Sequence, residues 1–142
     1  MDKEVALLAV IDRWIKQALH DLENAKKNME IGIYDVCLIL CQQAVEKMLK
    51  ALYIKKTGNE SPPRIHSLRK LVEETNMSDK ALTLVGELDS YYLALRYPDV
   101  TDRMPYEYCD QADANQGIKR AKEVIGLVET ELEERQGEKK DK

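Results

Sequence analysis

Two short segments carry the side chains that could recognise a phosphate or a base. In the first, Glu46, Lys47 and Lys50 lie within about one helical turn, and Glu46 and Lys50 have the i,i+4 spacing of an ion pair. One interpretation is a solvated ion pair, which contributes only about a few tenths of a kcal/mol. The other is that Lys47 and Lys50 face a cleft and bind phosphate oxygens. The second interpretation fits the surrounding segment, which is too apolar for a helix on the surface.

The second segment is Arg96-Tyr97-Pro98-Asp99. Proline disfavours helical geometry in the residue before it, so a helix should end here and its last side chains can project into a groove. A guanidinium in such a groove can bind a phosphate with two parallel donors, and a phenol ring offers a face to a base. Asp99 could orient Arg96. The alternative is a structural turn in which Arg96 caps backbone carbonyls or pairs with Asp99. Arg96 is the strongest single candidate for function.

Other polar residues give weaker signals. His66 stands at the expected start of a short helix, where a neutral imidazole can bond a backbone group, so a structural role is favoured. Cys37, Cys41 and Cys109 form an odd set, which favours reduced, buried thiols over a disulfide framework. Cys37 and Cys41 share a helix face but have no third ligand nearby in sequence. The glycines form no phosphate-binding loop. We therefore expect neither a metal nor a cofactor.

Helices must position these residues. Apolar residues recur with alternating spacings of three and four, which is typical of amphipathic helices packed in a bundle. The first such stretch spans residues 8–29. The second, 33–56, is apolar on nearly two sides, so we expect it at the centre of the fold. Gly58 should end it, because glycine readily takes the left-handed conformation of a helix C-terminus.

Three more helices are expected, one short and two long. They are, in chain order, a short helix that begins at His66 or Ser67, a helix from Ser78 to Leu95, and a final helix from about Asp110 to Glu134. Segment 96–109 has no clear period and is the favoured functional loop. Residues 136–142 contain no apolar side chain, so we expect a disordered tail after a single domain at 1–135. The predicted fold class is an all-α, antiparallel up-and-down bundle of four long helices plus one short helix.

Composition narrows the class of protein further. The chain has 142 residues, 44% of them apolar, which suits one domain with one core. A net charge of −4 argues against strong, sequence-independent binding to RNA or DNA, which usually needs a basic domain or stripe. No apolar run is long enough to span a membrane. The charged start Asp2-Lys3-Glu4 is unlike a signal peptide, so we expect a cytoplasmic protein.

Four features occur in the order found in prokaryotic HEPN proteins. They are Trp14 with Asp21-Leu22-Glu23, the run Cys41-Gln42-Gln43-Ala44-Val45-Glu46-Lys47 with Leu49-Lys50-Ala51, His66 with Leu68, and Leu95-Arg96-Tyr97-Pro98-Asp99. The sequence therefore resembles a stand-alone HEPN domain over almost its whole length. The resemblance implies a helical bundle, usually dimeric, that is similar to the substrate-binding helical domain of some nucleotidyltransferases. Many such proteins act beside a separate minimal nucleotidyltransferase, and the resemblance favours a place for His66 in the cleft.

The same family includes metal-independent ribonucleases, which carry an Arg, four to six residues, and a His at the start of the last helix. This chain has no histidine after His66. Arg13 and His20 do have six residues between them, but both lie in the first helix, about 10 Å of axial rise apart. The sequence also lacks the Gly-Ser and paired-aspartate pattern of a nucleotidyltransferase catalytic domain. Catalysis by this chain alone is therefore not favoured.

Together these observations predict a homodimeric, nucleotide-binding helical module that acts with a separate nucleotidyltransferase subunit, in a pair of the toxin–antitoxin type. Its ligand-binding residues would be Lys47, Lys50, His66, Arg96, Tyr97 and Asp99. Two alternatives stay open. One is a HEPN ribonuclease toxin with a degenerate site, in which Arg96 acts with Asp99 or Tyr97. The other is a dimerisation or scaffold protein without a ligand.

Overall fold

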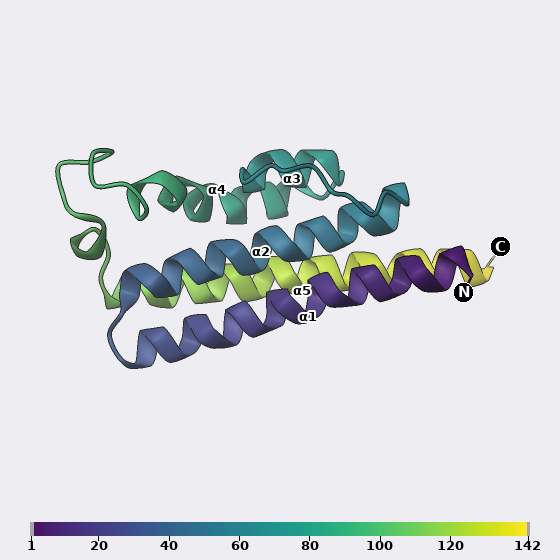
Figure 1. The fold of residues 1–142 in the computed structure, drawn as a ribbon, viewed down its shortest axis with the longest axis horizontal. Coiled ribbons are helices and arrows are strands. Elements are labelled where there is room, and N and C mark those ends of the chain that lie inside the picture. Colours follow the sequence, from purple (N-terminus) through teal and green to yellow (C-terminus); the bar gives the residue numbers. More distant parts are fainter. Residues whose placement is uncertain (1, 142) are drawn as a thin grey trace.

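The computed structural model describes the backbone of residues 2–141 and the side chains of residues 2–133. Over that part the chain is all-α and holds no strand. Its elements are α1 (Lys3–Glu30), α2 (Tyr34–Thr57), α3 (Leu68–Glu74), α4 (Asp79–Ala94), the 3-10 turn η1 (Pro105–Glu107) and α5 (Gln111–Asp141). α1 and α4 run opposite to α2 and α5 (Figure 1). The predicted fold class, four long helices and one short one in an antiparallel bundle, is confirmed.

α1 and α2 form a helical hairpin with a tight turn. Gly32 in that turn has φ +80°, a conformation in which a residue with a Cβ would be strained. α2 ends as predicted at Gly58, which has φ +74° and donates its N–H to the carbonyl of Ile54 at 2.8 Å. α1 therefore ends, and α2 begins and ends, where the sequence changes its pattern, whereas α1 begins at Lys3, before the predicted start at residue 8.

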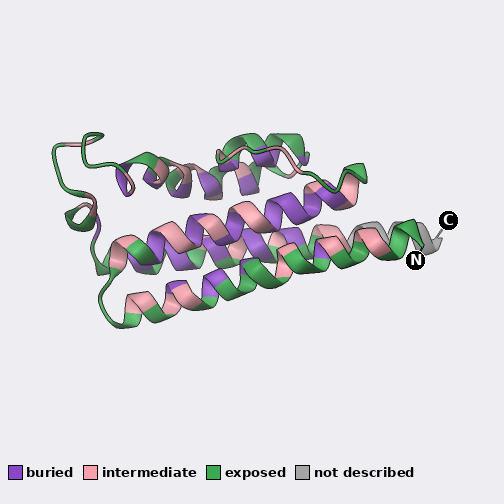
Figure 2. Cartoon of the chain, viewed as in Figure 1, coloured by how far each residue is buried: buried purple, intermediate pink, exposed green. Residues whose placement is uncertain are grey.

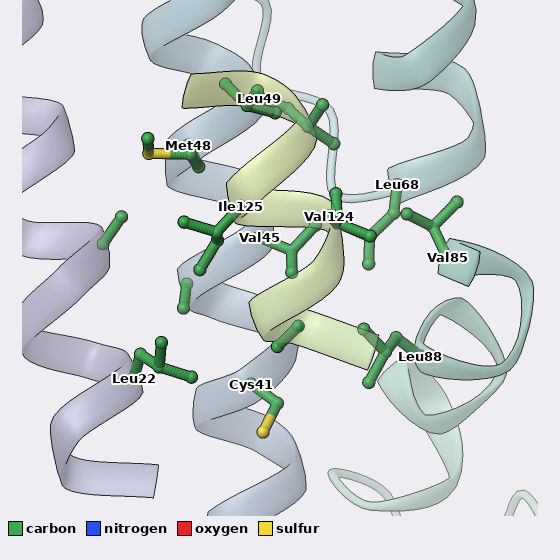
Figure 3. Packing of buried hydrophobic residues seen from close by; sticks show 14 of the residues in the cluster. Leu22, Cys41, Val45, Met48, Leu49, Leu68, Val85, Leu88, Val124 and Ile125 are labelled. Carbon is green, nitrogen blue, oxygen red and sulfur yellow. The ribbon is translucent and has the colours of Figure 1, made fainter. Parts of the chain in front are cut away.

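α2 is the central helix of the bundle. It contacts α1, α3, α4, α5 and η1, and twelve of its residues are buried. Figure 2 shows that buried residues cover much of α2, whereas α1 and α4 have a broad exposed side. In the core, Val45, Met48 and Leu49 of α2 lie among side chains from the other four helices (Figure 3). The near two-sided apolar pattern of segment 33–56 therefore predicted its place correctly.

α3 and α4 form a smaller layer against α2, and serine caps begin both helices. The Ser67 hydroxyl accepts a hydrogen bond from the N–H of Lys70, and the Ser78 hydroxyl accepts one from Ala81, each at 3.3 Å. Asp89 of α4 adds a second cap to α3, because its carboxylate accepts the N–H of Leu68 at 2.8 Å. This carboxylate ties the start of α3 to the middle of α4.

α5 packs closely against α2 because Gly117 has no side chain. A Cβ placed there would lie 2.2 Å from Cδ2 of Leu38, far inside van der Waals contact. The helix continues to Asp141, beyond the predicted end at Glu134. Side chains from 134 on, and residue 142 altogether, lie outside the described part of the chain. The disordered tail expected at 136–142 therefore stays a prediction.

The three cysteines are buried free thiols, as expected. Burial, assisted by the nearby carboxylates of Asp35 and Asp113, raises the pKa of Cys109 to about 12. Its hydrogen bond to Cys37 and its burial also raise the pKa of the Cys41 thiol. In the part of the chain that the structure describes, no helix is long and apolar enough to cross a bilayer.

Candidate functional site

Gln42 lies at the centre of the strongest polar cluster. Its side chain is fully buried on α2. Its amide nitrogen donates to the backbone carbonyl of His66 at 3.1 Å, and its amide oxygen accepts from the guanidinium of Arg96 at 3.0 Å. One buried amide thus fixes both the segment before α3 and the end of α4. A buried amide needs such partners, since leaving it unpaired would cost about 1–3 kcal/mol.

Tyr92 joins the two residues that Gln42 holds. The His66 imidazole stacks on the Tyr92 ring, with centroids 5.1 Å apart and planes 18° apart. The Arg96 guanidinium lies over the same ring at 4.1 Å, and its Nη1 donates to the Tyr92 carbonyl at 3.0 Å. The His66 side chain is 56% exposed and Arg96 is partly exposed. An aromatic ring, an imidazole and a guanidinium therefore meet at the surface.

Glu46 connects this cluster to Lys50. One oxygen of its carboxylate lies 3.1 Å from Nδ1 of His66, and the other lies 3.0 Å from Nζ of Lys50. The predicted i,i+4 pair is thus present, but it is not solvated: the Lys50 side chain is only 7% exposed. Lys50 is occupied by Glu46, and its ammonium also lies 6.0 Å from the Trp14 ring centre. Its ammonium is thus paired and largely buried, and its place in a ligand site stays a prediction.

Lys47 points toward α1, away from His66 and Arg96. Its ammonium pairs with the carboxylate of Asp21, which is 5% exposed and also accepts a hydrogen bond from Gln17 at 2.9 Å. Lys47 also lines a groove between α1 and α2. The structure therefore separates Lys47 from Arg96, although the sequence predicted one shared cleft for both.

Tyr97 and Asp99 lie in the exposed loop beyond α4. Tyr97 is 49% exposed. Within residues 2–133, no hydrogen bond or ion pair links either side chain to the Gln42 cluster. The expectation that Asp99 orients Arg96 is wrong, because Gln42 and the Tyr92 carbonyl hold the guanidinium instead. Part of the structural alternative is correct, since Arg96 does bind a backbone carbonyl at the end of α4.

Sequence reasoning missed Gln42 and Tyr92. A signal existed for each: Gln42, Glu46 and Lys50 follow one another at intervals of four along α2, and Tyr92 precedes Arg96 by four. The residues that the structure brings together are Gln42, Glu46, Lys50, His66, Tyr92 and Arg96. Within the described residues, no group of three acidic, histidine or cysteine side chains could hold a metal ion.

The fold and the polar cluster define an α-helical bundle protein with a site where α2, α4 and the segment before α3 meet. The chain belongs to the HEPN domain family, whose model matches residues 11–132. It is similar to the crystal structure of TT1696 from Thermus thermophilus, with a TM-score of 0.76 and 25% identity over 84% of this chain and 96% of that one. It is also similar to ST0689, an archaeal HEPN homologue, with a TM-score of 0.72 and 35% identity over 86% and 97% of the two chains. No curated protein matches it.

Proposed function

We propose that this HEPN protein is a nucleotide-binding helical module that acts with a separate nucleotidyltransferase subunit. The observation that carries the proposal is the contact of His66 and Arg96 with one ring, Tyr92, at the surface. The half-exposed imidazole offers a face to a base. The guanidinium on the same Tyr92 ring offers charged donors to a phosphate. These are the two parts that a nucleotide presents.

Arg96 keeps donors for a ligand. A guanidinium has five N–H groups. Arg96 uses one on the Tyr92 carbonyl and one on Gln42. The remaining donors can bind phosphate oxygens while these two bonds hold the side chain in place. Because the side chain is already ordered, binding would cost less conformational entropy than ordering a free arginine.

Arg96 brings a positive charge to the surface of this site, although the chain as a whole carries −4 and the Asp89 carboxylate is engaged with the start of α3. Glu46 neutralises Lys50, with which it forms an ion pair. Within residues 2–133, no carboxylate pairs with Arg96, so the charge of its guanidinium is left for a ligand. Removing that charge should therefore weaken binding of a phosphate more than binding of a nucleoside.

The finer parts of the proposal rest on the family resemblance. A separate minimal nucleotidyltransferase would supply the catalytic carboxylates that the sequence lacks, in a pair of the toxin–antitoxin type. A homodimer would present two copies of the site. Lys47, Tyr97 and Asp99 would contribute only to a ligand large enough to extend beyond the Gln42 cluster.

Isothermal titration with AMP, ATP, GTP and the matching nucleosides tests the proposal. We expect Arg96→Gln to weaken nucleotide binding by about tenfold or more, as for loss of a charge-assisted hydrogen bond, while nucleoside binding changes little. Arg64→Gln is the control for loss of an arginine charge, because Arg64 is an exposed arginine in the segment just before His66. Thermal melting checks that each variant is folded. Equal nucleotide affinities for the wild type and Arg96→Gln would refute the proposal.

A second candidate is metal-independent RNA cleavage, with His66 as base and Arg96 as the group that stabilises charge. It is favoured by one observation: the imidazole and the guanidinium both pack on the Tyr92 ring, although they are thirty residues apart in the chain. Incubation with structured RNA and a chelator tests it. Cleavage that disappears in both His66→Ala and Arg96→Gln would support this activity, and no cleavage by the wild type would exclude it.

A further inference from the structure

The groove between α1 and α2 that Lys47 lines is separate from the Gln42 cluster. Its volume is about 480 Å³, and its lining residues are Val10, Arg13, Trp14, Gln17 and Lys47. Four of the five belong to α1 and follow the spacing of one helix face. Small-molecule sites are commonly about 300–1,000 Å³. The groove is therefore large enough for a ligand with a single ring or with two fused rings.

The polar side of the groove is fixed by Asp21. This carboxylate is 5% exposed, and it pairs with Lys47 and accepts the amide N–H of Gln17 at 2.9 Å. The Lys47 charge is thereby neutralised, and the Gln17 side chain is oriented with its carbonyl oxygen unused. The side chains of Lys47 and Gln17 are therefore already ordered on one side of the groove, so a ligand would not have to immobilise them.

Trp14 forms the aromatic wall. It is partly buried and packs against a small cluster of Ile11, Ala51 and Ile54. This packing holds the indole in place while leaving part of it exposed in the groove. A fixed, partly exposed indole is a stacking surface for a planar ring.

Arg13 supplies the unneutralised charge. It is exposed, and within residues 2–133 no carboxylate pairs with it. The neighbouring acid on α1, Asp12, pairs instead with Lys16 at 2.8 Å. Because the Lys47 and Asp21 charges cancel, the groove carries one net positive charge. Its ligand should carry one negative charge.

We infer that this groove binds a planar aromatic ring that carries a single anionic group. The ring stacks on Trp14 and contacts Val10, and the anion binds the Arg13 guanidinium at the rim. Gln17 can accept an N–H or O–H from the ring edge. The site does not rest on the proposed nucleotide site, because Arg13 and Trp14, which bind its ligand, lie outside the Gln42 cluster. Lys47 lines the groove and would reach only a nucleotide ligand that extends beyond that cluster, and Lys50 of the cluster lies near Trp14.

The test uses 2-naphthoate, with 2-naphthamide as a neutral analogue and acetate as an anion without a ring. Trp14 is the sole tryptophan, so its indole N–H gives a single assigned signal in a ¹H–¹⁵N spectrum. We expect 2-naphthoate to shift this signal saturably, 2-naphthamide to bind about tenfold more weakly, and acetate to leave it unmoved. Arg13→Gln should abolish the preference for naphthoate over naphthamide.

Two control variants show whether the binding is specific to this groove. Lys16→Gln removes a positive charge three residues along α1 that does not line the groove, and it should leave naphthoate binding unchanged. Arg96→Gln should also leave it unchanged, so that failure of the nucleotide proposal and failure of this one are distinguishable. The inference is overturned if the indole signal does not move, if naphthamide binds as tightly as naphthoate, or if Arg13→Gln binds like the wild type.

Discussion

Replacing Gln42 by methionine removes both polar ends of a buried side chain while nearly keeping its volume. Two hydrogen bonds are lost, one to the charged Arg96 and one to the His66 carbonyl. A bond to a charged group is worth about 1.5–3 kcal/mol and a neutral one about 0.5–1.5 kcal/mol. Water can reach the partly exposed Arg96 and reduce the first cost. We therefore expect a loss in the free energy of unfolding of about 2–3 kcal/mol.

The neighbouring residue gives a matched control. Gln43 is partly exposed and has no hydrogen bond from its side chain within residues 2–133, so Gln43→Met should change stability by less than about 0.5 kcal/mol. Urea unfolding measures both, and for a domain of this size Gln42→Met should also lower Tm by roughly 5–10 °C. The same variant should weaken nucleotide binding, because it releases Arg96 and His66. Equal stability of the two variants would refute the assignment of Gln42 as the centre of the site.

Three further predictions concern packing, capping and reactivity. Gly117→Ala should lower the free energy of unfolding by about 1–3 kcal/mol, because its Cβ clashes with Leu38. Gly126→Ala, where a Cβ meets nothing, should be neutral or stabilising by up to about 1 kcal/mol. Urea unfolding of the two variants measures the difference. Asp89→Ala should cost about 1–2 kcal/mol because α3 loses the second of its two caps and keeps only Ser67. Asp89→Asn should recover part of that loss, and recovery close to zero would contradict the capping role. Because its pKa is raised to about 12, Cys109 holds little thiolate at pH 8. Iodoacetamide should therefore modify Cys109 far more slowly in the native protein than in urea. A native reaction rate that levels off near pH 9 would contradict the raised pKa.

The helices could be predicted because each has a local cause in the sequence. Spacings of three and four marked the buried faces, Ser78 and Gly58 marked helix ends, and the two-sided apolar pattern placed α2 at the centre. The site was harder to predict, because the sequence does not show which residue a charged side chain will pair with. Lys47 and Lys50 are three apart on one helix, yet one pairs with Asp21 of α1 and the other with Glu46. The Glu46 partner could be predicted from the i,i+4 spacing, but the Asp21 partner depends on which helix packs beside α2, and periodicity does not specify that.

Gln42, Glu46 and Lys50 occupy one row of the helix that contributes most to the core, a position where apolar residues would be expected. A buried ion pair such as Glu46–Lys50 is often no more stabilising than apolar residues of similar volume, because desolvation offsets the attraction. In this chain every buried polar side-chain atom of the described residues has a partner, so the row does not weaken the fold by leaving groups unpaired. What the row does supply is position: Gln42 fixes Arg96 and the backbone of His66, and Glu46 fixes the imidazole. The Glu46–Lys50 pair thus adds little net stability, yet together with Gln42 it holds the side chains of two surface residues, Arg96 and His66, in fixed positions, as the proposed ligand site would require.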